Sequence, residues 1–322
     1  MSGRIRQPGR SGPGPAAGAS KAAGAGTAAV LAAGAAACVA RAAYAALRRK
    51  PPGGAGTWTR TNHRGEQLTL LEGPALTVAG VAVSAIGPGL PPQARAALAV
   101  AGAGAAAFGG YDDLAGSGSR RGFRGHLGAL GRGEVTTGAV KLGGIGATGL
   151  AAGALLGGGP VDVAVNAGLV AGGANLLNLF DLRPGRALKV ALAGGTLLAT
   201  RPGARPAVAA PLGAAAALLP EDLGERAMLG DAGANALGAL LGVAAAASLS
   251  RPARLVLLAA ITGLTAASEV VSFTAVIERT PALRRLDMLG RRAVPAAQVP
   301  GRDHAPPAEA REAGTTAAAA PS

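Results

Sequence analysis

The sequence predicts an all-α fold, a polytopic transmembrane bundle of about nine or ten membrane helices with its site on the cytoplasmic loops. Only 15% of the 322 residues are charged, against about 25% in an ordinary soluble domain. Long stretches without a charged residue recur along the chain, and a membrane helix needs roughly 20 mostly apolar residues. A soluble domain of buried Ala-rich helices is the alternative, but nine such stretches leave little amphipathic surface.

Charge-free runs define the nine candidate membrane helices. They are 22–40, 73–94, 96–111, 142–161, 163–180, 190–200, 206–220, 232–250 and 255–268. The Gly-, Pro- and Ser-rich segment 1–21 and the Pro- and Ala-rich segment 293–322 are predicted to be disordered tails, which leaves 22–292 as the membrane domain. Within that domain Gly149, Gly153 and Gly157 repeat every four residues, a spacing that favours close helix contact.

The basic residues predict the orientation of the bundle. The chain carries a net charge of +14 and a single cysteine, Cys38, which excludes an intrachain disulfide framework and a Cys-cluster metal site. If the helices alternate in direction, one set of loops carries 20 Lys and Arg residues and the other side nine. The positive-inside rule places the richer set in the cytoplasm, although the basic tail 1–21 then lies outside. The positive charge is therefore explained by the orientation of the helices and by anionic lipid headgroups. It does not indicate nucleic-acid binding, because the sequence has no motif for DNA or RNA recognition.

Four acidic residues fall on that predicted cytoplasmic face. Asp112 and Asp113 follow the third run, Asp181 follows the fifth, and Asp231 precedes the eighth. Carboxylate oxygens from several helix ends favour a Mg²⁺ site over a softer metal. Any one of these acids alone is better explained as an ordinary helix-end residue, and Asp231 beside Gly230 as an N-cap. The set as a whole, with its adjacent pair, favours the metal interpretation.

Other polar residues lie near these acids. Arg120, Arg121 and Arg124 follow the acidic pair, and arginine forks match phosphate oxygens, although positive-inside placement also explains them. Asn175 and Asn178 share a helical face that leads to Asp181, which favours either an interhelical hydrogen bond or a functional site. All seven aromatic residues lie near predicted cytoplasmic helix ends or in cytoplasmic loops. Two explanations are open: they form the inner half of an aromatic belt, or they form a platform for a nucleobase or sugar.

Three segments, in this order, resemble a known family. They are GYDDLAGS at 110–117, NLLNLFD at 175–181 and MLGDAGANALG at 228–238. They resemble the polyprenyl-phosphate N-acetylhexosamine-1-phosphate transferases, the glycosyltransferase family 4 group that includes the phospho-N-acetylmuramoyl-pentapeptide and N-acetylglucosamine-1-phosphate transferases. The resemblance covers roughly residues 24 to 290, and its third segment is the most specific.

The resemblance implies an activity. A membrane bundle would bind a UDP-amino sugar from the cytoplasm, and the phosphate of a polyprenyl phosphate would attack the sugar-linked phosphorus, with Mg²⁺ required and UMP released. Asp112 and Asp113 would orient or deprotonate the lipid phosphate and share the catalytic role with Asp231. The metal ligands would be Asp231, Asp113 and Asp181. Substrate binding would fall to Asn175, Asn178, Asp181, Arg120, Arg121 and Arg124. The expected location is the plasma membrane, and the arrangement allows a homodimer.

The chain departs from the family pattern at several places, among them the first cytoplasmic loop, where NHRGEQLTLLEG at 62–73 lacks the usual Pro-rich Gly-Gly segment. The family continues the middle motif with a second Asp, where this chain reads Asp181-Leu182-Arg183-Pro184-Gly185. The histidine cluster of the last cytoplasmic loop is absent. These departures keep open a second function, a catalytically degenerate homologue that acts as a membrane scaffold or lipid-phosphate binder. A secondary transporter is a third class, with Lys141, Glu269 and Pro211 as its candidate groups.

Overall fold

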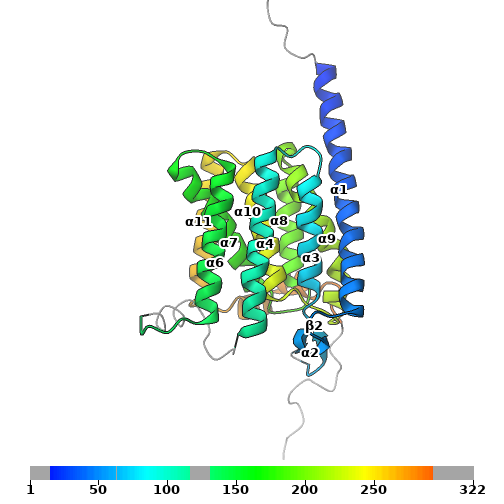
Figure 1. Ribbon diagram of the computed structural model, residues 1–322, viewed down its shortest axis with the longest axis vertical. Coiled ribbons are helices and arrows are strands. Elements are labelled where there is room, and N and C mark those ends of the chain that lie inside the picture. Colours follow the sequence, from blue (N-terminus) through cyan, green and yellow to red (C-terminus); the bar gives the residue numbers. More distant parts are fainter. Residues whose placement is uncertain (1–14, 63, 117–130, 293–322) are drawn as a thin grey trace, which may run out of the picture. The chain divides into compact units, whose positions relative to one another are not determined.

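The computed structural model describes residues 15–62, 64–116 and 131–292. These residues are mostly helical, as predicted, and up to Arg291 they form one compact unit (Figure 1). Within them, three helical stretches are long and apolar enough to cross a membrane, and the number rises to four if one bent pair counts as a single span. The stretches are Gly26–Arg49, Thr137–Leu156 and Pro160–Phe180, and the bent pair is Arg251–Ser268 with Phe273–Arg279, at 92°. The all-α class is therefore confirmed, whereas nine or ten spans stay a prediction.

The helices run back and forth, and each predicted run overlaps a different one of them for most of its length. In chain order the elements are α1 (Pro15–Arg49), α2 (Ala55–Trp58), β1 (Thr59–Thr61), β2 (Gln67–Thr69), α3 (Glu72–Ile86), α4 (Pro92–Ala115), α6 (Thr137–Leu156), α7 (Pro160–Phe180), α8 (Arg186–Ala199), the 3₁₀ turn η1 (Pro202–Ala204), α9 (Arg205–Leu223), α10 (Gly230–Ser248), α11 (Arg251–Ser268), α12 (Phe273–Arg279) and α13 (Pro281–Met288).

The boundaries of several helices differ from those of the predicted runs, and two of the differences have a clear cause in the sequence. Helix α1 begins at Pro15, so that residues 15–21 are helical although they were predicted to belong to a disordered tail. Proline suits the first helical position and the following alanines have the highest helix propensity, which favours this early start. Helix α3 ends at Ile86, eight residues before the end of the run 73–94, because Gly87 and Pro88 break the helix. The rest of the predicted tails, 1–14 and 293–322, lies outside the described residues.

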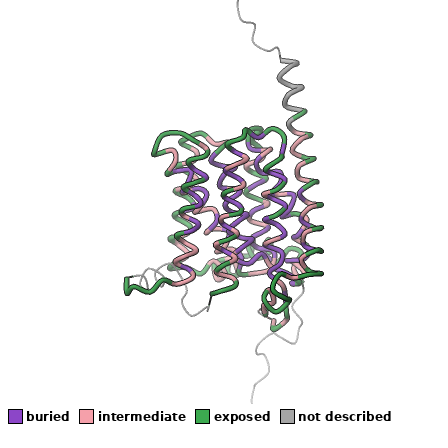
Figure 2. Tube along the Cα trace, in the orientation of Figure 1, coloured by how far each residue is buried: buried purple, intermediate pink, exposed green. Residues whose placement is uncertain are grey.

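Helix α10 is the central element of the bundle. Fifteen of its side chains or glycine positions are buried (Figure 2), and it packs against α3, α4, α7 and α9. Leu237, Leu240 and Val243 are fully buried there. Helix α11, in contrast, buries only Ile261. Because α10 is surrounded by neighbours, its first turn is held where the ends of several other helices meet.

The glycine repeat on α6 has the packing role that its spacing predicts at two of its three positions. A methyl group on Gly149 would lie 2.8 Å from the carbonyl oxygen of Ala167, and one on Gly153 would lie 2.7 Å from that of Val163. Helix α6 therefore approaches the backbone of α7 closely. Gly157 differs, because it is the C-cap of α6 at a φ of 79° and has no neighbour within 4 Å.

We expect Gly153→Ala to lower the melting temperature of the detergent-solubilised protein, because the added methyl group would push α6 away from α7 at a cost of about 1–3 kcal/mol. Gly146 on the same helix is the matched control, since nothing lies within 4 Å of its added methyl group. Gly146→Ala should raise stability by up to about 1 kcal/mol through helix propensity. Equal melting temperatures for the two variants would contradict the close packing of α6 on α7.

Candidate functional site

The site is organised around the start of α10. Asp113, in the last turn of α4, accepts hydrogen bonds from the backbone N–H of Asp231 at 3.0 Å and of Ala232 at 2.9 Å. These groups belong to the unpaired N–H groups of a helix N-terminus, where the helix dipole also favours negative charge. Gly230 makes room for the contact: its φ is 61°, and a methyl group there would lie 2.9 Å from the Asp113 carboxylate. Asp113 thus holds the end of α4 to the start of α10.

Lys141 contacts two further carboxylates beside Asp113, those of Asp112 and Asp231. The residue lies one turn into α6, and its Nζ is 2.6 Å from Oδ2 of Asp112 and also contacts Oδ2 of Asp231. The side chains of the three residues are no more than 26% exposed. One ammonium therefore balances two carboxylates, and the three groups come from three different helices, α4, α6 and α10.

Asp181 approaches the same helix start from α7. It is the C-cap residue of α7 and is 7% exposed. Burial, together with the negative charges of Asp222, Asp231 and Asp113, raises the pKa of Asp181 well above its usual range, against the effect of a backbone hydrogen bond from Gly230. Its Oδ2 has no hydrogen-bond partner among the described residues. The structure thus gathers Asp112, Asp113, Asp181 and Asp231 at one end of the bundle, which is called the carboxylate end below.

The other predicted site residues are only partly placed. Asn175 and Asn178 are half-buried in the last two turns of α7, and their side chains make no hydrogen bond with any residue in the described ranges. Arg120, Arg121 and Arg124 lie outside the described residues. The phenyl rings of Phe180 and Phe273 stack on each other at 5.2 Å, which occupies one face of each ring. Tyr111, beside Asp112, is 47% exposed.

Three residues that the sequence analysis did not place in the site belong to this end of the bundle. Lys141 is the first. Glu72, in the first turn of α3, is fully buried, and neither of its carboxylate oxygens has a hydrogen-bond partner among the residues that the structure describes. Asp222 at the end of α9 is 2% exposed. Oδ1 of Asp222 accepts the Gly185 N–H at 2.9 Å and so holds the turn that follows Asp181. Their signal was available, because each lies at an end of an apolar run on the predicted cytoplasmic side.

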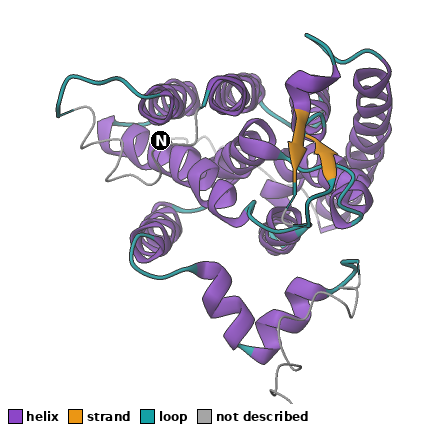
Figure 3. Ribbon diagram, turned by 90° about the horizontal axis from the view of Figure 1, so that it is seen from below, coloured by secondary structure: helices purple, strands orange, loops and turns teal. Residues whose placement is uncertain are grey.

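A small cap covers part of the carboxylate end. Strands β1 and β2 pair antiparallel with Thr59 opposite Thr69, and Thr69 also bridges to Ala227 just before α10. Arg60 donates a hydrogen bond to the backbone carbonyl of Asp113. Arg64 forms a buried ion pair with Glu225 at 3.0 Å. Seen from this end in Figure 3, the hairpin lies across the ends of neighbouring helices, and it fixes the segment that leads into α10.

The charges at this end have unequal proton affinities. Asp113 and Asp222 lie beyond the ends of the apolar runs, and burial raises the pKa of each to about 7. The charge of Asp231 raises the pKa of Asp113 further, and two backbone hydrogen bonds oppose this. Burial also acts on Asp112, but hydrogen bonds from Lys141 and Thr137 outweigh it and lower the pKa of Asp112. Asp112 therefore loses its proton at a lower pH than Asp113 does.

We expect the stability of the metal-free protein to fall as the pH rises from about 4 to about 7. In the folded state Asp113 and Asp222 hold their protons up to about pH 7, whereas the unfolded chain releases them near its ordinary pKa of about 4. Raising the pH through this window therefore favours the unfolded chain. Thermal melts at pH 5 and pH 7.5 check this, and Asp222→Asn should flatten the slope. A melting temperature that rises across the window would contradict the assignment.

The donor set at the carboxylate end has the chemistry of a divalent-cation site. Asp112 and Asp231 already share a cation, the Lys141 ammonium, and Asp181 keeps one buried carboxylate oxygen without a partner. Hard oxygen ligands of this kind suit Mg²⁺. In the described part of the chain, no three His, Cys, Asp or Glu side chains are close enough together to hold a metal ion as they stand. A bound cation would have to replace the Lys141 ammonium between the two carboxylates.

Comparison with known proteins adds no family assignment: no family model matches the chain, and no curated protein matches it at a significant level. The resemblance to the sugar-1-phosphate transferases therefore depends on the three motif segments alone.

Proposed function

We propose that the chain is a membrane-embedded, Mg²⁺-dependent transferase of the polyprenyl-phosphate N-acetylhexosamine-1-phosphate transferase family. It would move a sugar 1-phosphate from a UDP-N-acetylhexosamine to polyprenyl phosphate, giving a polyprenyl-diphospho-sugar and UMP for cell-envelope polysaccharide or peptidoglycan precursor synthesis. The observation that carries this proposal is the meeting of Asp112, Lys141 and Asp231, from three different helices, beside the backbone contact of Asp113 with α10. All three motif segments of the resemblance contribute to that end of the bundle.

Placement of the full bundle in the plasma membrane, with nine spans and the carboxylate end in the cytoplasm, belongs to the same proposal. The apolar outer surface of the helices supports it. Large apolar side chains on different helices are more than half exposed, namely Val30, Leu31, Val161, Leu197 and Val256. A soluble protein would expose no such spread of apolar surface, whereas a membrane protein presents it to lipid. The predominance of Lys and Arg in the loops of the carboxylate end supports the orientation.

The residues at the carboxylate end can bind and orient two phosphate-bearing substrates. Asp113 holds the start of α10 against the end of α4 and so fixes the position of Asp231 relative to Asp112. Lys141 supplies a cation for a phosphate oxygen. Asp231 and Asp181 remain the proposed metal ligands, and Asp112 replaces Asp113 as the third, because both Asp113 oxygens already accept backbone N–H groups of α10. When bound, the metal would supply positive charge that stabilises the transition state. Asn175, Asn178 and the arginines at 120, 121 and 124 are proposed to bind the nucleotide and the second phosphate.

The transfer needs positioning and charge neutralisation more than a strong base. A phosphate monoester has a second pKa near 6, so the lipid phosphate is mostly dianionic at neutral pH. One of its oxygens forms a bond to the sugar-linked phosphorus, the bond from that phosphorus to the bridging oxygen breaks, and UMP leaves with the electron pair. We therefore assign Asp112 and Asp113 to orientation and anchoring before proton abstraction.

The proposal is tested by measuring UMP release from UDP-N-acetylglucosamine and polyprenyl phosphate in membranes that contain the protein, with and without Mg²⁺. The expected result is Mg²⁺-dependent release coupled one to one with a polyprenyl-diphospho-sugar. A known transferase of this class, expressed in the same membranes, serves as the positive control. Absence of product above background while the control enzyme works would count against this substrate pair.

A second candidate, the lipid-phosphate binder or membrane scaffold, is favoured by one observation. The Lys141 ammonium already fills the space between Asp112 and Asp231, and such a cation can meet an anionic headgroup without a metal. The middle motif also lacks the second Asp of the family pattern. Binding of radiolabelled polyprenyl phosphate with no UMP release, in the presence of Mg²⁺, would favour this second function.

A further inference from the structure

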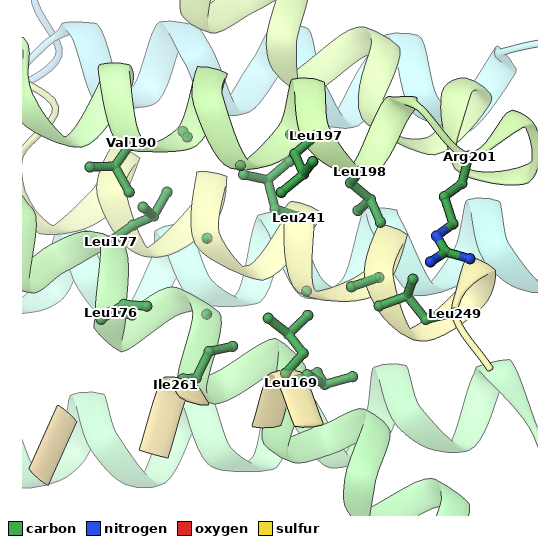
Figure 4. Close-up of a pocket in the computed structure, with 18 of the residues that line it drawn as sticks. Leu169, Leu176, Leu177, Val190, Leu197, Leu198, Arg201, Leu241, Leu249 and Ile261 are labelled. Carbon is green, nitrogen blue, oxygen red and sulfur yellow. The ribbon is translucent and has the colours of Figure 1, made fainter. Parts of the chain in front are cut away.

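A cavity opens between α7, α8, α10 and α11 and extends from Leu177, one turn before Asp181, to Arg201 at the other end of α8. It has a volume of about 490 Å³ and is lined by apolar side chains, among them Leu169, Leu177, Val190, Leu197, Leu241 and Ile261 (Figure 4). Along α8 the lining runs from Val190 to Thr200, which corresponds to a length of about 15 Å at 1.5 Å per residue. An apolar groove of this length can hold an extended alkyl chain.

A single cation lines this cavity, and it lies at the end opposite the carboxylates. Arg201 is exposed, and Figure 4 shows its side chain directed toward Leu249, which follows the last turn of α10. Its guanidinium has no hydrogen bond or ion pair with any residue in the described ranges. Asp231 stands at the other end of α10, whose 19 residues span about 28 Å. Apolar walls therefore end at an unpaired guanidinium near one end of the bundle.

We propose that this cavity binds an anionic glycerophospholipid from the leaflet opposite the carboxylate end, with an acyl chain along α8 and the phosphate at Arg201. An arginine fork pairs well with a phosphate, and apolar burial of the chain supplies most of the binding free energy. Polyprenyl phosphate as the transferase substrate does not fit this site, because its phosphate must reach Asp112 and Asp231 at the other end. The inference goes beyond the proposed function and depends only on the membrane location of the bundle.

The test uses the full-length protein, purified in detergent and stripped of lipid, with native mass spectrometry as the readout. Dioleoyl-phosphatidylglycerol is compared with dioleoyl-phosphatidylcholine and with free glycerol 3-phosphate. We expect the anionic lipid to bind at least about tenfold more tightly than the zwitterionic lipid, and glycerol 3-phosphate not to bind. Arg201→Gln should abolish the preference, and Arg201→Lys should keep part of it. Arg251→Gln is the matched control, since Arg251 is an exposed arginine near the same end that faces Asp162 at 3.7 Å.

A second pair of variants tests the groove itself. Gly194 lines the cavity and has nothing within 4 Å of an added methyl group, so we expect Gly194→Leu to occupy part of the groove and to weaken binding of both lipids by about tenfold. Gly263→Leu on α11 is the control, because Gly263 is equally open but does not line the cavity. Equal affinities of the wild-type protein for both lipids, or an unchanged preference in Arg201→Gln, would overturn the proposal. Asp231→Asn should bind the anionic lipid normally, which separates this result from any failure of transferase activity.

Discussion

Replacing Asp231 with Asn is expected to lower the rate of UMP release by at least about 10²–10³-fold, which is the loss seen when one pre-organised electrostatic group is removed from an active site. The amide keeps the size of the side chain and leaves the backbone N–H of residue 231 available to Asp113. It removes one of the two negative charges that meet the Lys141 ammonium. Initial rates at saturating Mg²⁺ are the measurement.

Asp162→Asn is the matched control for this variant. Asp162 lies in the first turn of α7, at the end away from the carboxylates, where it pairs with Arg254 at 3.1 Å. The control should release UMP at close to the wild-type rate, and both variants should be present in the membrane at similar levels. Wild-type turnover in Asp231→Asn would remove Asp231 from the proposed catalytic set.

The second large effect is expected at the junction of α8 with α13. The carboxylate of Asp287 accepts hydrogen bonds from Nε and Nη2 of Arg186 at 2.7 and 3.1 Å, and from Arg291 at 2.9 Å. Arg186 is 4% exposed, so Asp287→Ala would leave a buried guanidinium without its counter-ion. Loss of one partner from a buried pair costs about 3–5 kcal/mol. We expect that destabilisation in thermal melts, together with faster proteolysis between α11 and α13.

Glu278→Gln provides the comparison on the neighbouring helix. Glu278 pairs with Arg183 at 3.7 Å and its side chain is 57% exposed. Surface pairs contribute about 0–1 kcal/mol, so this variant should melt close to the wild-type protein. Burial tends to raise the pKa of Asp287, but Arg186 outweighs it and lowers that pKa, so the pair stabilises above about pH 4 and is lost as the pH falls further. Equal melting of Asp287→Ala and Glu278→Gln would contradict the structural role of the buried pair.

Much of the architecture follows from where charged residues interrupt the apolar runs. The acids at 112, 113, 181 and 231 fall at helix ends, and alternation of helix direction is sufficient to predict that they share one end of the bundle. The sequence does not reveal how Asp113 is used, because an acid at a helix end can coordinate a ligand or cap another helix. The hydrogen bonds to the N–H groups of Asp231 and Ala232 arise from tertiary packing.

Lys141 shows the corresponding limit for a basic residue. A lone lysine at the end of an apolar run can extend toward the membrane surface or bind an acid inside the bundle. Its position one turn into α6 predicts how far along the helix axis it lies. Whether its side chain points toward Asp112 and Asp231 depends on how α6 is rotated about its own axis relative to α4 and α10. Glu72 and Asp222 were missed for a different reason: they lie at helix ends like the other acids, but outside the three recognised motif segments.

The central claim is that the acidic end of α4 lies against the start of α10, and an engineered disulfide tests it most directly. A Cβ on Gly110 would lie 3.6 Å from the Cβ of Ala232, within the roughly 3.5–4.5 Å range of disulfides. In a Cys38→Ala background, we expect Gly110→Cys with Ala232→Cys to cross-link on mild oxidation, so that the two halves stay joined after protease cleavage between α4 and α6. Gly110→Cys with Gly146→Cys should not cross-link. Halves that separate in the first pair as they do in the control would contradict the claim.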